Sequence, residues 1–364
     1  MSVHLASLFM SHFRSHQRTQ LICDGRPVAL SGLNGAGKTN ILEAISLLSP
    51  GRGLRRAAPE EIARKPQALG WKLRAGITCA HGLRQIETWA EPSQPRQLRI
   101  DDKAVPQTML GEIAAMLWLT PAMDRLWLEG PDGRRRFLDR IVLSFRPGHA
   151  TQTLAYEKAM RERNRLLRDQ ISDAGWYAAI EAQMAQAGAE ISANRHHALA
   201  ALADHSIADG PFPQADLALE CTAPRVADDL ATALAEGRRR DMAAGRSLTG
   251  PHRADLGAVW AAKGMAAAQC STGEQKAMLI SILLANARAL RTRDGHAPIL
   301  LLDEVAAHLD AGRRAALYDA LCDLGAQAFL TGTGAELFAD LGPRAQHFTV
   351  SERDGRSILE EIAP

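Results

Sequence analysis

The chain has 364 residues, of which 46% are hydrophobic, so it can bury one large core or two modest ones. A predominantly disordered protein is therefore excluded. The formal net charge is only +2, which excludes a global basic field, so any surface that binds DNA must be local.

The cysteines and the hydrophobic runs restrict the cellular context. Five cysteines stand far apart with no Cys-x-x-Cys pair: Cys23, Cys79, Cys221, Cys270 and Cys322. This spacing argues against a disulfide framework and a zinc site. The start of the chain lacks a basic segment followed by an apolar one, and the longest apolar run, near residues 277–287, is shorter than the roughly 20 residues of a membrane-spanning helix. We therefore expect a cytoplasmic protein without a membrane partner.

Residues 1–125 are predicted to mix strands and helices. An apolar strand at 28–31 runs into a glycine-rich loop and then into a helix at 39–48, whose apolar residues share one side. The loop has the sequence Gly32, Leu33, Asn34, Gly35, Ala36, Gly37, Lys38 and Thr39. Further strands are expected within 76–87 and 97–105. The order of strand, loop and helix is the context that a phosphate-binding loop requires.

The chemistry of this loop predicts ATP and Mg²⁺ as cofactors. Backbone N–H groups from Gly35 to Thr39 can surround the β- and γ-phosphates, because glycine permits the close backbone that this needs. Lys38 supplies a positive charge, and the Thr39 hydroxyl is placed to bind Mg²⁺. A string of this type also arises by chance in long proteins, but the flanking strand and helix favour the phosphate site.

The middle of the chain is predicted to be helical. Residues 151–206 indicate a hairpin of two long helices, with apolar stripes on each. On the opposite face of the first helix we expect a basic group: Lys158, Arg161, Arg163, Arg165 and Arg168. Residues 207–247, which contain prolines and then charges, are expected to form a return connection with short elements of its own.

The α/β pattern resumes after Leu248. Helices are predicted at 277–290 and 312–324, and buried strands at 299–302 and 327–331. The first of these strands ends in Asp303 and Glu304. Asp303 would hold Mg²⁺ through water, and Glu304 would orient and deprotonate the attacking water. An aspartate in this place could instead cap a helix, but the adjacent pair and the later Asp310 favour an ATPase.

A third motif precedes the acidic strand. Ser271 and Glu274 have capping-box spacing, so they would begin the helix with a free positive end. Taken alone, this segment would be an ordinary helix cap. Its place before Asp303 makes it a candidate ABC-type signature, which binds the γ-phosphate of a nucleotide held by a second copy of the protein.

Together these motifs resemble the SMC-like branch of ABC ATPases. Three further segments, at 34–45, 130–139 and 250–256, are similar to the RecF family, and the similarity runs from Phe13 to the region of Thr331. The resemblance implies an α/β fold, an ABC-type P-loop ATPase head. Its ATP-binding lobe would comprise residues 1–125 and 248–364, with a mainly helical lobe of residues 126–247 inserted between the two halves.

The resemblance also implies a function in recombinational repair and replication. It implies an ATP-dependent DNA-binding protein that dimerises on ATP, recognises single-stranded or gapped DNA, and supports recombinase loading with RecO and RecR and the SOS response. Carried over by position, Gly32 to Thr39 bind the nucleotide, Thr39 and Asp303 bind Mg²⁺, and Glu304 activates water. Ser271 and Gly273 would reach the partner's γ-phosphate, and Asp310 would belong to the loop that spans the dimer.

Two departures from the usual ABC pattern indicate slow hydrolysis. No glutamine stands near residues 117–120, and Thr331-Gly332-Thr333 replaces the histidine that follows the next strand in many ABC proteins. A weak, DNA-stimulated ATPase that serves as a switch is therefore expected, rather than a motor.

The sequence alone leaves more than one interpretation of the arginine runs and of the function. The runs Arg134–Arg136 and Arg238–Arg240 could contact DNA phosphates, or they could be solvated faces or intramolecular pairs. His252 and Arg253 could equally be structural. The alternative function is the ATP-binding subunit of a membrane transporter. A chromosome-organising SMC protein or a zinc-hook repair ATPase is disfavoured, because the inserted segment is too short for a long coiled coil and the hook's cysteine pair is absent.

Overall fold

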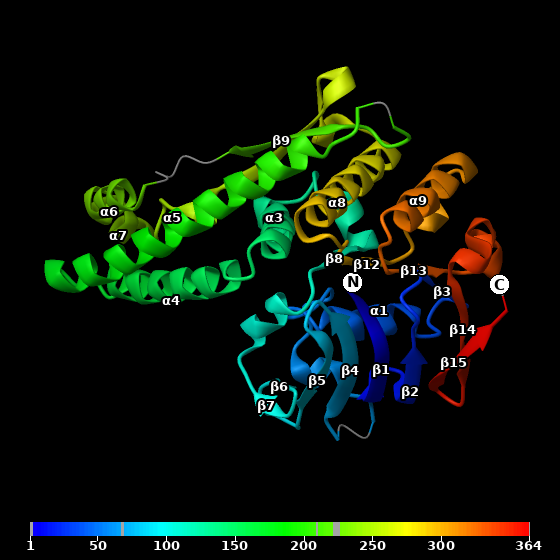
Figure 1. The fold of residues 1–364 in the computed structure, drawn as a ribbon. Coiled ribbons are helices and arrows are strands. Elements are labelled where there is room, and N and C mark those ends of the chain that lie inside the picture. The colour runs from blue at the N-terminus through cyan, green and yellow to red at the C-terminus, as the bar shows by residue number, and fades with distance from the viewer. Residues whose placement is uncertain (1–2, 67–68, 209, 221–225, 364) are drawn as a thin grey trace. The chain divides into compact units, whose positions relative to one another are not determined.

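The computed structural model describes residues 3–66, 69–208, 210–220 and 226–363 (Figure 1). The described residues form two compact units. Unit 1 contains those within 1–124, 205–214 and 271–364, and unit 2 contains those within 125–204 and 215–270. The chain leaves unit 1 and returns to it twice, so segments that are distant in the sequence build each unit.

A six-stranded sheet in unit 1 joins the two ends of the chain. Its strand order is β15 (Arg356–Ile362), β14 (Gln346–Arg353), β3 (Val28–Ser31), β13 (Ala328–Gly332), β12 (Ile299–Leu302) and β8 (Met116–Leu119). All neighbours from β14 to β8 are parallel, and β15 is antiparallel. The four strands β3, β13, β12 and β8 are buried throughout, as expected of apolar strands in a parallel sheet.

Three helices of unit 1 carry the predicted motifs. Helix α1 (Lys38–Ser46) follows β3 and buries Ile41, Leu42 and Ile45 completely. Helix α8 (Thr272–Asp294) is buried along most of its length and ends at Gly295, whose φ of 77° only glycine adopts easily. Helix α9 (Ala311–Asp323) lies between β12 and β13 in the sequence. Strand, helix and strand thus alternate as the sequence predicted.

A second, antiparallel sheet completes unit 1. Its order is β2 (His16–Ile22), β1 (His4–Phe13), β4 (Trp71–Cys79), β5 (Gly82–Ala90), β6 (Gln97–Ile100) and β7 (Lys103–Ala104). The strands predicted within 76–87 and 97–105 are observed as parts of two tight hairpins, β4–β5 and β6–β7. Residues of this sheet, β3 and α1 share one hydrophobic core. The short helix α2 (Pro59–Ile62) and 3-10 helices at 107–112, 121–125, 306–308 and 335–344 connect these elements.

Unit 2 is mainly helical and has one small sheet. Its helices are α3 (Pro131–Phe145), α4 (His149–Arg168), α5 (Ala174–Asp204), α6 (Ala227–Glu236) and α7 (Arg238–Ala244). Helices α4 and α5 form the predicted hairpin and pack through Tyr156, Met184 and Ile191, which share a core with Leu230 of α6. Strands β9 (Ala215–Glu220), β10 (Asp255–Trp260) and β11 (Met265–Ala266) form an antiparallel sheet in the order β11-β10-β9.

The units differ from the predicted lobes at the second boundary. Residues 248–270 were assigned to the ATP-binding lobe, but β10 pairs with β9 over its full length, from Asp255 opposite Glu220 to Trp260 opposite Ala215. These backbone hydrogen bonds hold the segment in unit 2. Residues 205–214, assigned to the helical lobe, belong instead to unit 1. Of the cysteines, Cys221 lies outside the described residues, and Cys23, Cys79 and Cys322 are free thiols.

The predicted basic face of α4 is wrong at Arg163. This side chain is fully buried, and its guanidinium donates to Glu181, Asp241, Ser247 Oγ and the Leu234 carbonyl oxygen. The apolar stripe of this helix predicted that Arg163 lies on the outer face. An arginine is rarely buried unless it is paired, so a charged residue off the stripe is expected to be exposed. Its acidic partners are distant in the sequence, so the pattern within α4 could not reveal them.

Candidate functional site

The glycine-rich loop is a tight turn between β3 and α1. Gly32, Gly35 and Gly37 have φ angles of 150°, 86° and 108°, which residues with a side chain rarely adopt. A Cβ on Gly37 would lie 2.3 Å from Ser357 Oγ and 2.7 Å from Ser15 Oγ. The loop tip from Leu33 to Gly35 is exposed, whereas the part that enters α1 is buried. The backbone of this loop therefore has the close, partly left-handed course that a phosphate cradle needs.

Lys38 points back into its own loop. Its ammonium group donates to the carbonyl oxygens of Gly32 over 2.6 Å and Leu33 over 2.9 Å. The residue is only 4% exposed, and burial lowers its pKa, while the nearby carboxylates of Glu304 and Asp303 raise it. The positive charge is thus held inside the turn, beside the two acidic residues that end β12.

Asp303 links the loop to the neighbouring strands. Its Oδ1 accepts hydrogen bonds from Thr39 Oγ1 and from Thr331 Oγ1, each over 2.8 Å. Because β12, β13 and β3 are neighbouring parallel strands, their carboxyl ends meet at one edge of the sheet, where these three residues lie. The two halves of the predicted site, near opposite ends of the sequence, are therefore in direct contact.

Glu304 follows in a constrained backbone conformation. Its φ is 53°, which is uncommon for a residue with a side chain, and its N–H donates to Thr331 Oγ1 over 2.9 Å. The residue is half-buried. Backbone strain of this kind clusters at functional sites, where the surrounding structure holds it in place. Thr331 thus fixes both acidic residues.

The predicted signature segment caps α8. Ser271 Oγ accepts from the Glu274 N–H, and the Glu274 carboxylate accepts from the Ser271 N–H over 2.8 Å, so both halves of the capping box are present. Ser271 and Gly273 are exposed, and a Cβ on Gly273 would meet nothing within 4 Å. The segment presents the positive end of a long helix to its surroundings.

Asp310 has a similar role at α9. Its Oδ1 accepts from the Arg313 N–H over 2.9 Å, and 66% of its side chain is exposed. The structure therefore shows Asp310 as a helix cap at the end of the loop that begins at Asp303. The second carboxylate oxygen lies 3.8 Å from the Arg313 guanidinium.

Sequence reasoning missed a buried histidine beneath the loop. His16 has no exposed surface, and its Nε2 lies 3.1 Å from the Gly37 carbonyl oxygen. A carbonyl can only accept, so Nε2 carries the proton and Nδ1 accepts from Thr19 Oγ1 over 3.0 Å. Burial lowers the pKa of His16 to about 4, so the imidazole is neutral near pH 7. No sequence motif marks this residue.

A second missed group joins α1 to the antiparallel sheet. Glu43 is 1% exposed and pairs with Arg14 over 2.7 Å and with Arg55 over 3.2 Å. Ser357 Oγ donates to the Ala36 carbonyl oxygen over 2.6 Å, so a strand near the end of the chain also supports the loop. These contacts support the phosphate loop and the start of α1. In the sequence, only the position of Glu43 on the apolar side of the predicted helix indicated them.

Most of the arginines in the two runs are paired within unit 2. Arg134 forms a double hydrogen bond with Asp255, and Arg135 donates to the Ala254 carbonyl oxygen. Arg238 pairs with Glu181 over 2.5 Å and lies 5.3 Å from the Tyr177 ring centre. Arg239 is exposed, and among the residues that the structure describes it has no ion pair. His252 Nε2 donates to the Ser247 carbonyl oxygen over 3.0 Å, so Nδ1 accepts from the Tyr156 hydroxyl over 2.7 Å, a contact internal to the helical unit.

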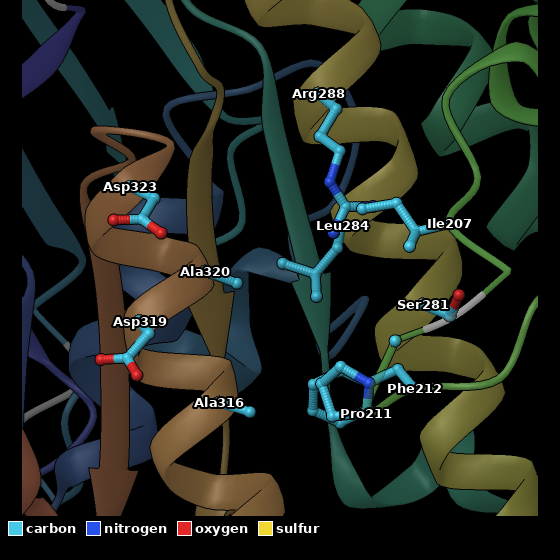
Figure 2. Close-up of a pocket in the computed structure, with 11 residues that line it drawn as sticks. Ile207, Pro211, Phe212, Ser281, Leu284, Arg288, Ala316, Asp319, Ala320 and Asp323 are labelled. Atoms are coloured by element: carbon cyan, nitrogen blue, oxygen red, sulfur yellow. The ribbon is translucent and has the colours of Figure 1, made fainter.

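A groove in unit 1 lies apart from the phosphate loop. Figure 2 shows Leu284 and Arg288 of α8 across from Ala316 and Ala320 of α9, with Pro211 and Phe212 between the two helices. Its cavity volume is about 290 Å³, and none of the residues that line it belongs to the loop at 32–39. Asp319 is already paired with Arg344 over 2.7 Å. The groove is therefore not part of the nucleotide site.

The fold and the site define the class of protein, an ABC-type P-loop ATPase head. Residues 4–356 match the family model described as the RecF/RecN/SMC N terminal domain. None of the described helices is long and apolar enough to cross a membrane.

Comparison with curated relatives narrows the class further. The chain is 47% identical to the DNA replication and repair protein RecF of Rhizobium johnstonii over 97% of this chain and 98% of that protein. It is equally 47% identical to the RecF of Brucella suis biovar 1, covering 96% and 95% of the two chains. The chain belongs to the RecF family. A solved structure of the recombination mediator protein RecF with ATP has the same fold, with a TM-score of 0.82 and 24% identity over 100% of this chain and 98% of that one.

Proposed function

We propose that this chain is an ATP-dependent DNA-binding protein of recombinational repair and replication, and that ATP joins two copies of it. The observation that carries the proposal is the contact of Asp303 with Thr39 and Thr331, which brings the loop and the acidic strand together. This contact supports an ATP site, because an aspartate that merely capped a helix would bond to backbone N–H groups. The names of the curated relatives support the role in repair and replication.

ATP would lie on the loop of residues 32–39, with its phosphates on the N–H groups between Gly35 and Thr39. Lys38 would exchange the two carbonyls that it now contacts for phosphate oxygens. Thr39 Oγ1 and Asp303 Oδ1 are oxygen ligands of the type that Mg²⁺ takes, and they already converge within 2.8 Å. When bound, Mg²⁺ would neutralise charge that develops on the phosphate oxygens.

Glu304 would accept a proton from the water that attacks the γ-phosphate. Its backbone N–H is fixed by Thr331, and its carboxylate forms no ion pair with any residue that the structure describes. The Thr331 hydroxyl is committed to both acidic residues, so it is not available as a further contact to the γ-phosphate. This arrangement supports slow hydrolysis and a switch in which nucleotide state controls assembly.

Ser271 and Gly273 would contact the γ-phosphate of ATP held by a second copy. Both are exposed at the positive end of α8, and the space around Gly273 is open. Asp310, exposed at the end of the loop from Asp303, would lie in the same contact between subunits. The proposed homodimer would therefore enclose two nucleotides, each bound by the loop of one subunit and the helix start of the other.

The proposed substrate is single-stranded or gapped DNA in the cytoplasm, in support of recombinase loading and the SOS response. A solved neighbour is described as a recombination mediator in the RecFOR pathway, which supports RecO and RecR as partners. The ATP-binding subunit of a transporter is not favoured, because relatives that match nearly the whole chain are named for DNA replication and repair.

Binding of labelled gapped DNA in the presence of ATP or ADP tests this function. The wild-type protein should bind gapped DNA more tightly with ATP. The variant Lys38→Ala should lose this difference, because removal of a charge-assisted phosphate contact in a largely buried site reduces ATP affinity. Lys72→Ala, which removes an outer ion pair with Glu87, is the matched control and should behave as wild type. Equal DNA binding with ATP, with ADP and without nucleotide would contradict the proposal.

A further inference from the structure

One end of the helical hairpin in unit 2 forms a surface that no nucleotide motif explains. Leu167 of α4, Tyr177 of α5 and Met242 of α7 belong to one hydrophobic cluster, so the end of α4, the start of α5 and helix α7 meet there (Figure 1). The position that a Cβ on Gly245 would take lies 3.5 Å from Arg168 Cγ, so the residues after α7 adjoin the end of α4. We call this surface, made by residues 165–177 and 238–246, the hairpin end.

An exposed tryptophan stands on the hairpin end. Trp176 is 62% exposed, although its indole would gain much by burial. Its backbone N–H donates to Asp173 Oδ1 over 3.2 Å, so the indole projects from an ordered first turn of α5. Within the described part of the chain, no ring or cation lies against this indole. Its face is available to a partner.

The exposed arginines of the hairpin end give this surface an excess of positive charge. Arg168, Arg239 and Arg246 are exposed, and they form no ion pair with any residue that the structure describes. The nearby acidic groups are engaged elsewhere. Asp169 pairs with Arg165 over 3.7 Å, Glu181 and Asp241 are buried against Arg163, and Asp173 accepts N–H groups at the start of α5.

We propose that the hairpin end binds the single-stranded part of gapped DNA, with Trp176 stacked on an unpaired base and Arg168, Arg239 and Arg246 on phosphates. An exposed aromatic ring and uncompensated cations on one surface are the combination that binds single strands without sequence preference. Bases within a duplex are stacked on each other, so they cannot receive the indole. The inference rests on the proposed DNA-binding function and deepens it by naming a site for the unpaired strand.

A protein partner fits this surface less well. The exposed apolar part of this surface is a single indole, whereas the fully buried centre of a protein interface is about 65% apolar. The charge excess complements a phosphate backbone. We therefore assign the surface to nucleic acid and treat binding to other molecules as an outcome that contradicts the assignment.

Fluorescence anisotropy with the full chain and a labelled oligothymidylate tests the role of the ring. Trp176→Ala should weaken binding by about 10-fold, since stacking of one base contributes on that scale, while binding to a blunt duplex stays within about twofold of wild type. Trp176→Phe should retain most of the affinity because it keeps an aromatic face. Leu154→Ala is the matched control, because it truncates an exposed apolar side chain of α4 outside the hairpin end. It should leave the affinity for oligothymidylate unchanged.

The salt dependence of binding tests the arginines. In the triple variant Arg168→Gln, Arg239→Gln and Arg246→Gln, the slope of log affinity against log salt should fall by about 2, since each phosphate contact on a single strand contributes about 0.7. Arg161→Gln is the matched control, because Arg161 is exposed on α4 but paired with Glu157 over 3.7 Å. It should leave the slope close to that of wild type.

The outcomes separate this inference from the proposed function. If wild-type protein binds gapped DNA with ATP but neither set of variants weakens oligothymidylate binding, the hairpin end is not the site, and the proposed function stands. Equal losses for oligothymidylate and blunt duplex in Trp176→Ala would also overturn the stacking assignment. If the wild-type chain binds none of the DNAs with ATP, the proposed function itself fails.

Discussion

Thr331 donates its hydroxyl hydrogen to Asp303 Oδ1 over 2.8 Å, and its oxygen accepts the Glu304 N–H over 2.9 Å. Thr331 begins the segment Thr331-Gly332-Thr333, which replaces the histidine of many ABC proteins, according to the resemblance seen in the sequence. One short side chain therefore fixes both acidic residues of the proposed site. Asp303 in turn holds Thr39 of the phosphate loop, so the three elements form one connected hydrogen-bonded group.

Replacing Thr331 by valine removes the hydroxyl and keeps the shape. The Glu304 N–H and one Asp303 lone pair would then lose a buried partner, which should reduce the free energy of unfolding by about 1–3 kcal/mol. ATP hydrolysis should fall further than ATP binding, because the loop itself is unchanged. Urea denaturation and nucleotide-binding measurements check both effects. Thr331→Ser keeps the hydroxyl and is the control, and a valine variant with wild-type hydrolysis would show that the contact has no role in the site.

Gly37→Ala should damage the loop more than Gly35→Ala. Both glycines have positive φ, so each alanine should cost about 1–2 kcal/mol of backbone strain. At Gly37 the new Cβ would also collide with Ser357 Oγ and Ser15 Oγ, whereas at Gly35 it meets nothing within 4 Å. Both variants carry the backbone strain, but only Gly37→Ala has the collision. The difference between their melting temperatures therefore measures the cost of the collision. Equal melting temperatures would mean that Ser15 and Ser357 move aside freely.

His16 should make the stability of unit 1 depend on pH. Its pKa is about 4 in the folded chain and near 6.5 when exposed, so the unfolded chain binds more protons between these values. The neutral imidazole therefore stabilises the fold fully above pH 6.5, and this contribution is lost as the pH falls toward 4. The shift corresponds to about 3 kcal/mol.

The variant His16→Gln isolates this contribution. Glutamine can still donate to the Gly37 carbonyl oxygen but does not titrate, so the free energy of unfolding should fall less steeply between pH 7 and pH 4.5 than in wild type. Replacing the exposed His81 in the same way serves as the control, and it should leave the wild-type slope. Identical slopes for all three proteins would show that His16 is not held neutral.

Arg163→Ala should destabilise unit 2 strongly. The change leaves Glu181 and Asp241 buried with fewer partners, and breaking a buried ion pair in this way costs about 3–5 kcal/mol. Arg161→Ala, two residues away on the exposed face of α4, should cost less than about 1 kcal/mol. Chemical denaturation followed by circular dichroism compares them. Similar unfolding midpoints for both variants would mean that the buried cluster adds no stability.

The sequence predicted the elements whose causes are local. The strand at β3, the glycines that need positive φ, the capping box at Ser271 and the buried strand before Asp303 all follow from residues within a few positions. The ABC-type fold class was confirmed by the family model and by solved structures that share the fold. The roles of Ser271, Gly273, Glu304 and Asp310 stay proposals.

The sequence did not reveal contacts between distant segments. The burial of Arg163 depends on Asp241, and the neutral His16 depends on the Gly37 carbonyl, so neither has a local signal. Residues 248–270 belong to unit 2 because β10 pairs with β9, and the sequence near β10 does not indicate this distant partner. Periodicity shows which face of an element is apolar, but it does not show which polar side chains find partners inside the fold.

Sedimentation velocity of Glu304→Gln, with and without ATP, tests most directly the claim that a second copy completes the nucleotide site. Glutamine keeps the shape of the side chain but cannot accept the proton from water, so ATP should persist in the site. We expect a monomer without nucleotide and a dimer with ATP, and we expect the additional change Ser271→Arg to abolish the dimer. A monomer that persists with saturating ATP, when ATP binding itself is measured and intact, would contradict this claim.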